Sequence, residues 1–307
     1  MILTVCPNPC IDCTIEIEDF KVGRLNRLDG KIENTAGKAL NTAVGIKRLG
    51  GECVASGFMF ETGGRRFERF LGGEGIPYDF VWEKGSVRVN YKIIDGKSMM
   101  TEINDRGDTV SEQGQEKLIE KVKKLSENCD MIVISGSLPS GIAPDYYARL
   151  IKCVPEGKKV VVDCDGEQLK RCVSAGVYMV KPNVHEVERF FNARVTSIED
   201  VKSYALQLID LGAKRALISM GKSGAVFTDG QRTFYSKSVN VAVNSTVGAG
   251  DSMLAAACLA IEEGADMPDT LKRAVAAGTA SVTTAGTNLF TKDKYLEILN
   301  ELTVEQI

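Results

Sequence analysis

Four short segments rich in β-branched and aliphatic residues constrain the fold most strongly. They span residues 131–135, 159–163, 177–180 and 215–219, and helical stretches lie between them. Such alternation of strand and helix is typical of a mostly parallel, doubly wound α/β sheet, whose ligands gather at the carboxyl ends of the strands. Polar residues or glycines follow these strands, so we expect distant parts of the chain to meet in one crevice.

The N-terminal part of the chain predicts a second, smaller sheet. Residues 12–18 alternate between apolar and polar types, and two β-rich runs flank Asp95-Gly96-Lys97, a turn that favours positive φ. With a strand near 28–34, they would form a small four-stranded β lid, drawn from about 12–18, 28–34 and 87–103, on a single domain of residues 1–307. One lid face would cover the site and the other must be hidden, often against a second copy. We therefore expect a homodimer through the lid sheet.

The segment Asn-Ser-Thr-Val-Gly-Ala-Gly-Asp-Ser at 244–252 indicates the chemistry most clearly. It leads straight into an apolar run, so a helix should begin here. Gly248, Ala249 and Gly250 bare the backbone at that point, and several N–H groups and the positive helix end can face one anion. Asp251 puts a carboxylate against this anion hole, which costs repulsion unless the carboxylate acts on a substrate hydroxyl. We therefore predict phosphoryl transfer to an alcohol.

Composition excludes several partners. The net charge of −3 and the pI of about 5.5 give no general attraction to nucleic acid or to an anionic membrane, so a phosphorylated ligand needs a local basic cluster. The N-terminus lacks a basic leader region, and no run approaches the ~18 apolar residues that span a bilayer. We expect a cytoplasmic protein.

The cysteines and the histidine argue against disulfides, an iron–sulfur cluster and histidine-based sites. Nine cysteines, an odd number, are scattered along the chain, as expected for reduced thiols. The spacing of Cys6, Cys10 and Cys13 matches the three-thiolate pattern of radical-SAM iron–sulfur enzymes, but the prolines and the alternation around them favour a strand edge with packing cysteines. His185 is the only histidine, which excludes histidine triads and multi-histidine metal sites.

Two common nucleotide-binding signatures are missing from the sequence. No Gly-Lys pair completes Gly-x4-Gly-Lys-Ser/Thr; the nearest, at Gly221, has Ala216 where the first glycine belongs. No Gly-x-Gly-x-x-Gly follows the first strand either. These absences weaken the P-loop and Rossmann dehydrogenase interpretations.

Motifs spread along the whole chain resemble those of the ribokinase-like, or pfkB, carbohydrate kinases. They are Asn8-Pro-Cys-Ile-Asp12, Ala36-Gly-Lys-Ala-Leu-Asn41, Ser135-Gly-Ser-Leu-Pro-Ser-Gly141, Lys181-Pro-Asn-Val-His-Glu186, Ile218-Ser-Met-Gly-Lys-Ser-Gly-Ala225 and the Gly-Ala-Gly-Asp segment. Within the family, the combination is most similar to the 1-phosphofructokinase and tagatose-6-phosphate kinase branch, and ribokinase and adenosine kinase are poorer matches. The resemblance implies a ribokinase-like fold, with ATP and Mg²⁺ as cofactors.

The resemblance also implies roles for residues on the nucleotide side. Nucleotide-binding residues would be Ser219, Gly221, Gly224, Thr246, Gly248 and Gly250, and the adenine would rest near a helix at 276–286. Asp251 would accept the hydroxyl proton, assisted by Gly248, Ala249 and Gly250, and its place at a helix N-terminus should lower its pKa. Alternatively, residues 219–224 are an ordinary hairpin turn, and Asp251 only stabilises its helix.

For the metal, the resemblance implies that Asn183 and Glu186 position hydrated Mg²⁺, which takes few direct protein oxygens. The same pair could be a helix N-cap and its N3 glutamate, and both roles can hold together. Asp163 and Asp165 follow a strand and could assist at the metal, although for them we favour turn formation.

The acceptor side carries the remaining candidates. Asp12 and Asn41 would bind sugar hydroxyls, Gly37 would let the backbone approach, and a phosphate on the sugar would be bound by basic and polar residues. These are Lys38, Arg27, Arg88, Asn90 and Ser137, although each charge alone is more often a solvated surface group. Departures from the family at Ala39 and in segments 60–66 and 101–108 also lie on this side, where Arg65 or Arg106 could be an extra ligand.

The function expected from the resemblance is ATP-dependent phosphorylation of a hexose phosphate, preferably of fructose 1-phosphate to fructose 1,6-bisphosphate. Tagatose-6-phosphate kinase or 6-phosphofructokinase activity is the alternative. A non-catalytic sugar-phosphate sensor is a second alternative, since Ala39 and the altered lid could impair closure.

Overall fold

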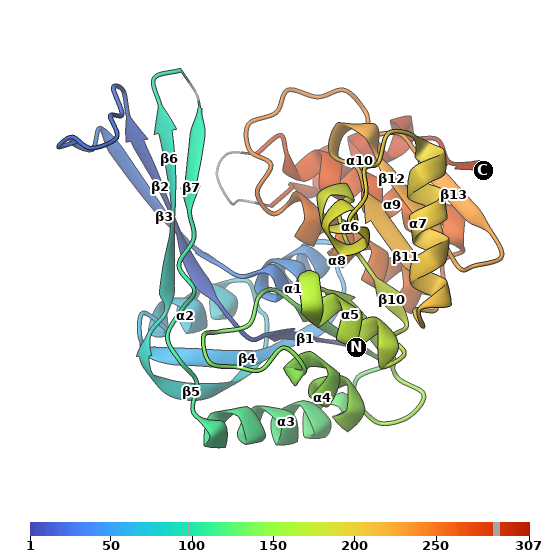
Figure 1. Cartoon of the computed structure of the whole chain (residues 1–307), viewed down its shortest axis with the longest axis horizontal. Coiled ribbons are helices and arrows are strands. Elements are labelled where there is room, and N and C mark those ends of the chain that lie inside the picture. The colour runs from blue at the N-terminus through green and yellow to red at the C-terminus, as the bar shows by residue number, and fades with distance from the viewer. Residues whose placement is uncertain (98, 285–288) are drawn as a thin grey trace.

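The fold is built on a large, mostly parallel sheet (Figure 1). The computed structural model describes residues 1–97, 99–284 and 289–307. In chain order, the strands of this sheet are β1 (Ile2–Cys6), β4 (Cys53–Thr62), β5 (Tyr78–Ser86), β8 (Met131–Ser135), β9 (Lys159–Asp163), β10 (Met179–Val180), β11 (Ala216–Ser219), β12 (Ala225–Thr228), β13 (Thr233–Ser236) and β14 (Glu305–Gln306). Their spatial order is β14-β13-β12-β11-β10-β9-β8-β1-β4-β5, parallel from β11 to β5 and antiparallel from β11 to β14.

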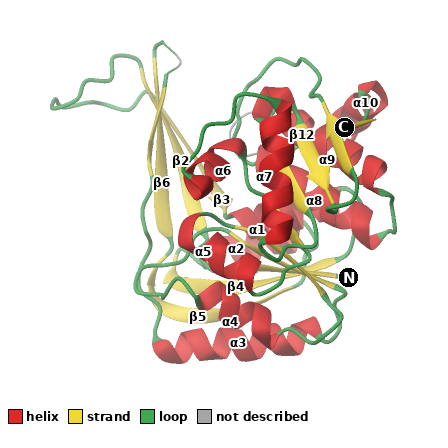
Figure 2. Ribbon diagram, turned by 45° about the vertical axis from the view of Figure 1, so that its right-hand side comes forward, coloured by secondary structure: helices red, strands yellow, loops and turns green. Residues whose placement is uncertain are grey.

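Helices cover both faces of the large sheet (Figure 2). They are α1 (Lys38–Arg48), α2 (Arg65–Gly73), α3 (Glu112–Ser126), α4 (Tyr146–Cys153), α5 (Gly166–Ser174), α6 (Val184–Phe191), α7 (Ile198–Asp210), the 3₁₀ turn η1 (Gly221–Ser223), α8 (Ala249–Glu262), α9 (Met267–Ser281) and α10 (Lys292–Glu301). α1, α8, α9 and α10 pack in succession, as do α3, α4, α5 and α6. Because both faces are covered, β1 and β8 are buried at every position, as their continuous apolar sequences predict.

A second sheet, the lid sheet, projects from this body (Figure 1). Its strands are β2 (Cys10–Ile17), β3 (Gly30–Ala36), β6 (Arg88–Asp95) and β7 (Met100–Ile103), in the order β3-β2-β6-β7. Asn34, Asp12 and Asn90 are direct neighbours across β3, β2 and β6, so their side chains share one face. That face is the one that carries the acceptor candidates.

The helix that follows Gly248 owes its depth to small side chains. α8 begins with Ala249 and is buried from Asp251 to Ile261. Gly45 of α1 faces it so closely that a Cβ there would lie 2.6 Å from the Cβ of Ala255. The alanine-rich sequence of α8 therefore lets α1 and α9 approach, which fixes the N-terminus of α8 deep in the molecule.

The predicted doubly wound sheet and the small four-stranded sheet are both present, and some boundaries differ. The strand expected at 177–180 is only Met179–Val180, and the helix expected to reach residue 286 ends at Ser281. The hairpin expected at 87–103 is present, although Ser98 lies outside the described residues. Among the described helices, none is long and apolar enough to cross a bilayer.

A close approach between β1 and β4 gives a test of the packing. Gly57 has φ of +139°, and a Cβ there would lie 1.9 Å from the backbone oxygen of Cys6. Gly57→Ala should therefore lower the free energy of unfolding by at least about 3 kcal/mol, measured by urea denaturation.

Gly72→Ala is the matched control, because a Cβ at this helical position in α2 meets nothing within 4 Å. It should raise stability by about 0.5–1 kcal/mol. Equal urea midpoints for the two variants would contradict the close approach at Gly57.

Candidate active site

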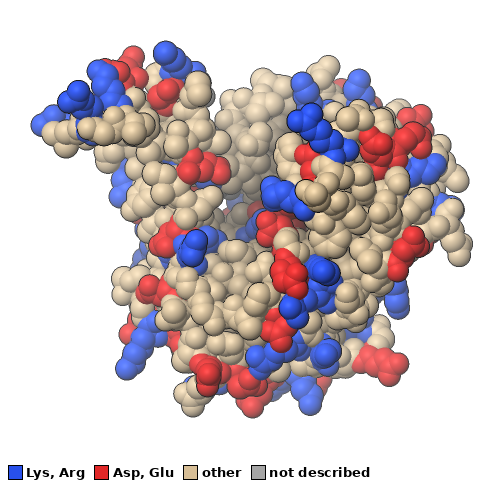
Figure 3. Space-filling model, in the orientation of Figure 1, with Lys and Arg blue, Asp and Glu red and all other residues tan. Residues whose placement is uncertain are grey.

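A hollow lies between the lid sheet and the body (Figure 3). Motifs from both halves of the chain are in contact, since Asn41 bonds to Asp251 and Lys38 pairs with Asp163. Contacts join the carboxyl end of β9 to the residue after β10 and to the first turn of α1, and they join α1 to the first turns of α6 and α8. The expectation that distant segments converge is therefore confirmed by the hydrogen bonds and ion pairs described below.

At the start of α8, the backbone forms an anion cradle. Gly248 is the N-cap with φ of 78°, and no side chain caps the helix. Among the described residues, nothing accepts a hydrogen bond from the N–H groups of Gly250 and Asp251. Two free N–H donors at the positive end of a helix suit a phosphoryl oxygen. A Cβ on Gly250 would lie 3.3 Å from the Nζ atom of Lys181, so glycine leaves room for that ammonium beside the cradle.

Asp251 is buried beside the cradle, with 6% of its surface exposed. The Nδ2 atom of Asn41, in α1, donates a hydrogen bond of 2.8 Å to its Oδ2. This bond joins the acceptor motif at 36–41 to the Gly-Ala-Gly-Asp motif. It also fixes the carboxylate within reach of any hydroxyl bound next to Asn41.

The pKa expected for Asp251 was wrong in direction. Burial raises the pKa of Asp251 to about 6, against the opposing attraction of the Lys38 ammonium. The helix dipole alone would lower it, but removal of the carboxylate from water is the larger effect at this depth. A carboxylate with a pKa near 6 is a better proton acceptor than an ordinary aspartate.

A buried ion-pair network lies next to Asp251. Asp163, at the end of β9, is 1% exposed, and its carboxylate lies 3.4 Å from Lys38 Nζ and 3.2 Å from Lys181 Nζ. Burial acts to raise the pKa of Asp163, but Lys181 and Lys38 outweigh it and lower the pKa. The turn role favoured for Asp163 is therefore incomplete, because this residue balances two ammonium groups beside the cradle.

On the acceptor side, Asp12 is held by residues of a neighbouring lid strand. Lys92 Nζ lies 2.6 Å from Asp12 Oδ2, and Asn90 Nδ2 donates to Oδ1 over 3.2 Å. Lys92 is 6% exposed, and the sequence analysis did not identify it. Its signal was its position two residues after Asn90, which puts both side chains on one face of a strand.

Arg88 connects two further acceptor candidates. Its guanidinium donates to Asn90 Oδ1 and to the backbone oxygens of Asp105 and Asn8, whereas its buried Nε has no partner among the described residues. Asn8 also donates to Ser137 Oγ, over 3.2 Å. A free buried N–H is a ready donor for an anionic oxygen.

Gly37 and Arg27 have contrasting positions. Gly37 is the N-cap of α1 with φ of 145°, and a Cβ there would lie 2.8 Å from Cys6 Sγ. Glycine is therefore required at this point of the acceptor motif. Arg27 lies in the exposed loop between β2 and β3, and no hydrogen bond or ion pair joins it to any other described residue. One copy of the chain does not bring Arg27 to the other candidates.

The nucleotide candidates surround the ends of β10 and β11. Ser219 forms a bridge with Asn183, and the turn from Met220 to Gly224 joins β11 to β12 as a hairpin. A Cβ on Gly224, whose φ is 89°, would lie 1.9 Å from the backbone oxygen of Ser236. The segment is thus a tight hairpin turn, which is the structural alternative given in the sequence analysis. It also lies beside Asn183 and Glu186, the pair predicted to position Mg²⁺.

Thr246 immediately precedes the cradle, and its backbone oxygen accepts from the N–H of Ala249. The helix expected near the adenine, at 276–286, coincides with the last turns of α9 up to Ser281. Residues 285 and 286 of that prediction lie outside the described residues.

Asn183 and Glu186 form a complete capping box at the start of α6. Asn183 Oδ1 accepts from the Glu186 N–H over 2.9 Å, and Glu186 Oε2 accepts from the Asn183 N–H over 2.8 Å. The other carboxylate oxygen, Oε1, lies 3.7 Å from Lys38 Nζ and faces the ion-pair network. One oxygen of Glu186 is therefore left for a hydrated cation.

The cysteines are all free, and each is buried except for the half-buried Cys153. Burial raises the pKa of Cys6 to about 11 and that of Cys53 to about 12. Within the described residues, no group of three or more His, Cys, Asp or Glu side chains could hold a metal ion.

Sequence comparison decides which family has this arrangement. The profile of the pfkB family carbohydrate kinases matches residues 7–294. The chain belongs to this family. It is therefore a carbohydrate kinase, and the ribokinase-like fold expected from the motifs is confirmed.

Individual relatives of this pfkB kinase extend over its whole length. It is 30% identical to a 1-phosphofructokinase of Bacillus subtilis (strain 168) over 308 residues, which is 100% of both chains. It is 29% identical to a tagatose-6-phosphate kinase of Staphylococcus epidermidis over 311 residues, again 100% of both chains. Among solved structures, it resembles phosphofructokinase-2 from Escherichia coli in complex with substrates and products, with a TM-score of 0.91, 29% identity and 98% of both chains covered.

The raised pKa of Asp251 gives the pfkB kinase a testable pH dependence. If Asp251 accepts the hydroxyl proton, as the motif predicts, only its ionised form is active, and kcat should fall as the pH drops through about 6. Asp251→Asn should lower kcat by ~10²-fold or more, with nucleotide affinity changed only a few-fold.

The same substitution should stabilise the protein. A folded pKa above the ordinary value of 3.8 means that ionisation opposes folding above about pH 6, and that this cost disappears as the pH falls toward 4. Asp251→Asn should raise the free energy of unfolding by about 1–3 kcal/mol at pH 7.5 and by less at pH 4. Asp293→Asn, in the exposed first turn of α10, is the control and should slightly destabilise. A fully active Asp251→Asn enzyme would refute the assignment.

Proposed function

We propose that the chain transfers the γ-phosphoryl group of ATP to the 6-hydroxyl of fructose 1-phosphate, which yields fructose 1,6-bisphosphate and ADP. The observation that carries this proposal is the buried Asp251 carboxylate beside two unpaired N–H groups and bound to Asn41. The 1-phosphofructokinase name of a full-length relative supports the choice of sugar. All 307 residues would act as one kinase domain.

In this proposal, the acceptor lies across Asn41 and Asp12 with its hydroxyl at Asp251. The hydroxyl oxygen attacks the γ-phosphorus of ATP and forms the new P–O bond. The bond between the γ-phosphorus and the oxygen that bridges it to the β-phosphate breaks, which releases ADP, and Asp251 takes the hydroxyl proton. The N–H groups of Gly250 and Asp251 stabilise charge on the moving phosphoryl group. Lys38 adds positive charge from the ion-pair network.

ATP would lie along Ser219, Gly221 and Gly224, with its phosphates toward Thr246, Gly248 and Gly250. The oxygen-rich surroundings suit Mg²⁺, a hard cation that retains most of its waters. Glu186 Oε1, the oxygen that the capping box does not use, would bind the ion through water, with Asn183 positioning the glutamate. When bound, Mg²⁺ neutralises phosphate charge.

The phosphate of the acceptor itself would bind at Arg88. The buried Nε without a partner supports this role, and Asn90 and Ser137 lie within the same hydrogen-bonded group. Phosphorylation of tagatose 6-phosphate is the second candidate, favoured by the name of the Staphylococcus epidermidis relative.

An ADP-release assay with phosphorylated and free sugars tests the function. We expect turnover with fructose 1-phosphate at a higher kcat/KM than with tagatose 6-phosphate, fructose 6-phosphate or fructose. Saturable sugar binding without ADP release would instead indicate the sensor.

Arg88→Ala should raise the KM for fructose 1-phosphate about tenfold or more, because a charge-assisted contact is lost, and should change the KM for ATP little. Arg171→Ala, an exposed residue on α5 that pairs with Glu167, is the matched control and should leave both constants unchanged. Equal effects of Arg88→Ala on the two substrates would count against its role.

We also propose a homodimer through the lid sheet, in the cytoplasm. Tyr91 and Ile103 are neighbours on β6 and β7, on the face opposite Asp12, and are 40% and 54% exposed. Adjacent exposed apolar side chains on a sheet favour burial against a partner.

Light scattering tests the dimer. Ile103→Lys should give a monomer, whereas Ile32→Lys should remain dimeric, because Ile32 is equally exposed but lies on the face that carries Asp12. A wild-type monomer at micromolar concentration would contradict this assembly.

A further inference from the structure

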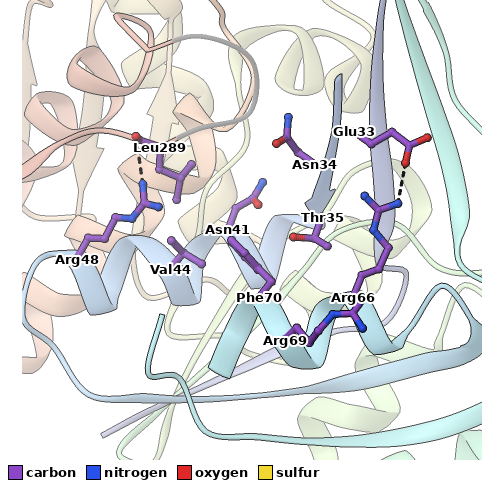
Figure 4. A pocket seen from close by; sticks show the side chains of 10 residues that line it. All are labelled: Glu33, Asn34, Thr35, Asn41, Val44, Arg48, Arg66, Arg69, Phe70 and Leu289. Carbon is purple, nitrogen blue, oxygen red and sulfur yellow. Dashed lines mark hydrogen bonds and ion pairs between the residues drawn. The ribbon is translucent and has the colours of Figure 1, made fainter. Parts of the chain in front are cut away.

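A cavity of about 320 Å³ lies at the free edge of β3, next to Asn41. Figure 4 shows Asn34 and Thr35 of β3 on one side of it and Asn41 of α1 on the other. Arg66 and Arg69 of α2 form one end, and Arg48 lies toward the other. No residue assigned above to the nucleotide lines it, and of the acceptor residues only Asn41 does.

The end of the cavity at α2 has excess positive charge. Glu33 pairs with Lys31 over 2.5 Å and with Arg66 over 2.7 Å, and these two cations lower its pKa. The Arg69 guanidinium has no hydrogen bond or ion pair with any described residue. Among the residues that line this end, Arg66 and Arg69 against Glu33 leave a net charge of about +1, and Lys31, which pairs with Glu33 from outside the cavity lining, raises the local charge to about +2. Such a charge beside a concave space attracts a dianion.

The two carboxylates near this end do not cancel that charge. Glu68, on α2, is engaged by the exposed Arg65 over 2.6 Å. At the other end, Arg48 is neutralised by Glu74 over 2.7 Å and donates to the backbone oxygen of Leu289. The positive charge that remains available to a ligand therefore belongs chiefly to Arg69 and Arg66.

The middle of the cavity offers polar groups that lack partners. Neither the Asn34 amide nor the Thr35 hydroxyl makes a hydrogen bond with a described residue. Asn41 uses its Nδ2 for Asp251, which leaves its Oδ1 free to accept. These groups suit the hydroxyls of a small polyol, and the guanidinium groups suit a phosphate, since arginine binds phosphate in a planar, bidentate manner.

We propose that this cavity is a second anion-binding site, which takes a small phosphate monoester with hydroxyl groups and is separate from the acceptor and nucleotide sites. The phosphate binds Arg69 and Arg66, and the hydroxyls reach Asn34, Thr35 and Asn41 Oδ1. Because Asn41 also binds Asp251, the ligand lies one side chain away from the catalytic carboxylate.

Titration calorimetry with glycerol 3-phosphate tests the site, with fructose 1-phosphate, Mg²⁺ and a non-hydrolysable ATP analogue already bound. We expect one saturable site per chain. Arg69→Ala should weaken binding about tenfold or more, equal to about 1.4 kcal/mol. Inorganic phosphate should bind more weakly with the same dependence on Arg69, and glycerol should give no binding heat.

Arg171→Ala is the control, because Arg171 lies on α5, is 47% exposed and does not line the cavity. It should leave the affinity unchanged. The affinities of wild type and Arg69→Ala for glycerol 3-phosphate are also measured without sugar or nucleotide. This comparison tests the second site whichever sugar the enzyme phosphorylates. Three results would each overturn the proposal. They are loss of binding when the acceptor site is filled, equal affinities of Arg69→Ala and wild type, and no saturable binding in the millimolar range.

Discussion

The arrangement of the active site depends on one buried carboxylate, that of Asp163. It lies between Lys38, at the first turn of α1, and Lys181, which follows β10 and borders the cradle of α8. A buried ion pair contributes little net stability, but the loss of one partner leaves uncompensated charge and is strongly destabilising. Three elements from distant parts of the chain are therefore held in one geometry, and their charges remain in place for an incoming polyphosphate.

In the lid sheet, too, a buried carboxylate is balanced by an ammonium group on another element, here Asp12 by Lys92. Asp12 would be a costly buried charge on its own, and Lys92 and Asn90 of the neighbouring strand occupy both of its oxygens. Because the three residues lie on paired strands, β-sheet register determines where the proposed acceptor contacts are. In the proposed function, the lid is thus a pre-organised half of the acceptor site as well as a cover.

The sequence predicts those structural properties that depend on neighbouring residues in the chain, and it fails for those that depend on tertiary packing. The segments 131–135 and 159–163 were identified to the residue, because strands buried on both faces contain an unbroken apolar run, here residues 131–134 and 160–162. β4 was missed, since Gly57 interrupts its pattern and is needed only for the contact with Cys6. The pKa of Asp251 was wrong in direction because the dipole is a local effect, whereas burial depends on α1 and α9. Lys92 could have been found from strand alternation. The charge balance around Arg69 could not have been found in this way, because it depends on contacts between distant segments.

The buried cysteines have a consequence for the durability of the enzyme. A protonated thiol is a poor nucleophile, and a pKa of about 11 or 12 keeps Cys6 and Cys53 protonated at neutral pH. Resistance to peroxide and to alkylating agents is therefore a property of the closed fold and not of the side chains themselves. Chains that unfold even transiently lose this protection, so oxidative damage should accumulate in the least stable molecules first and remove them irreversibly from the active population.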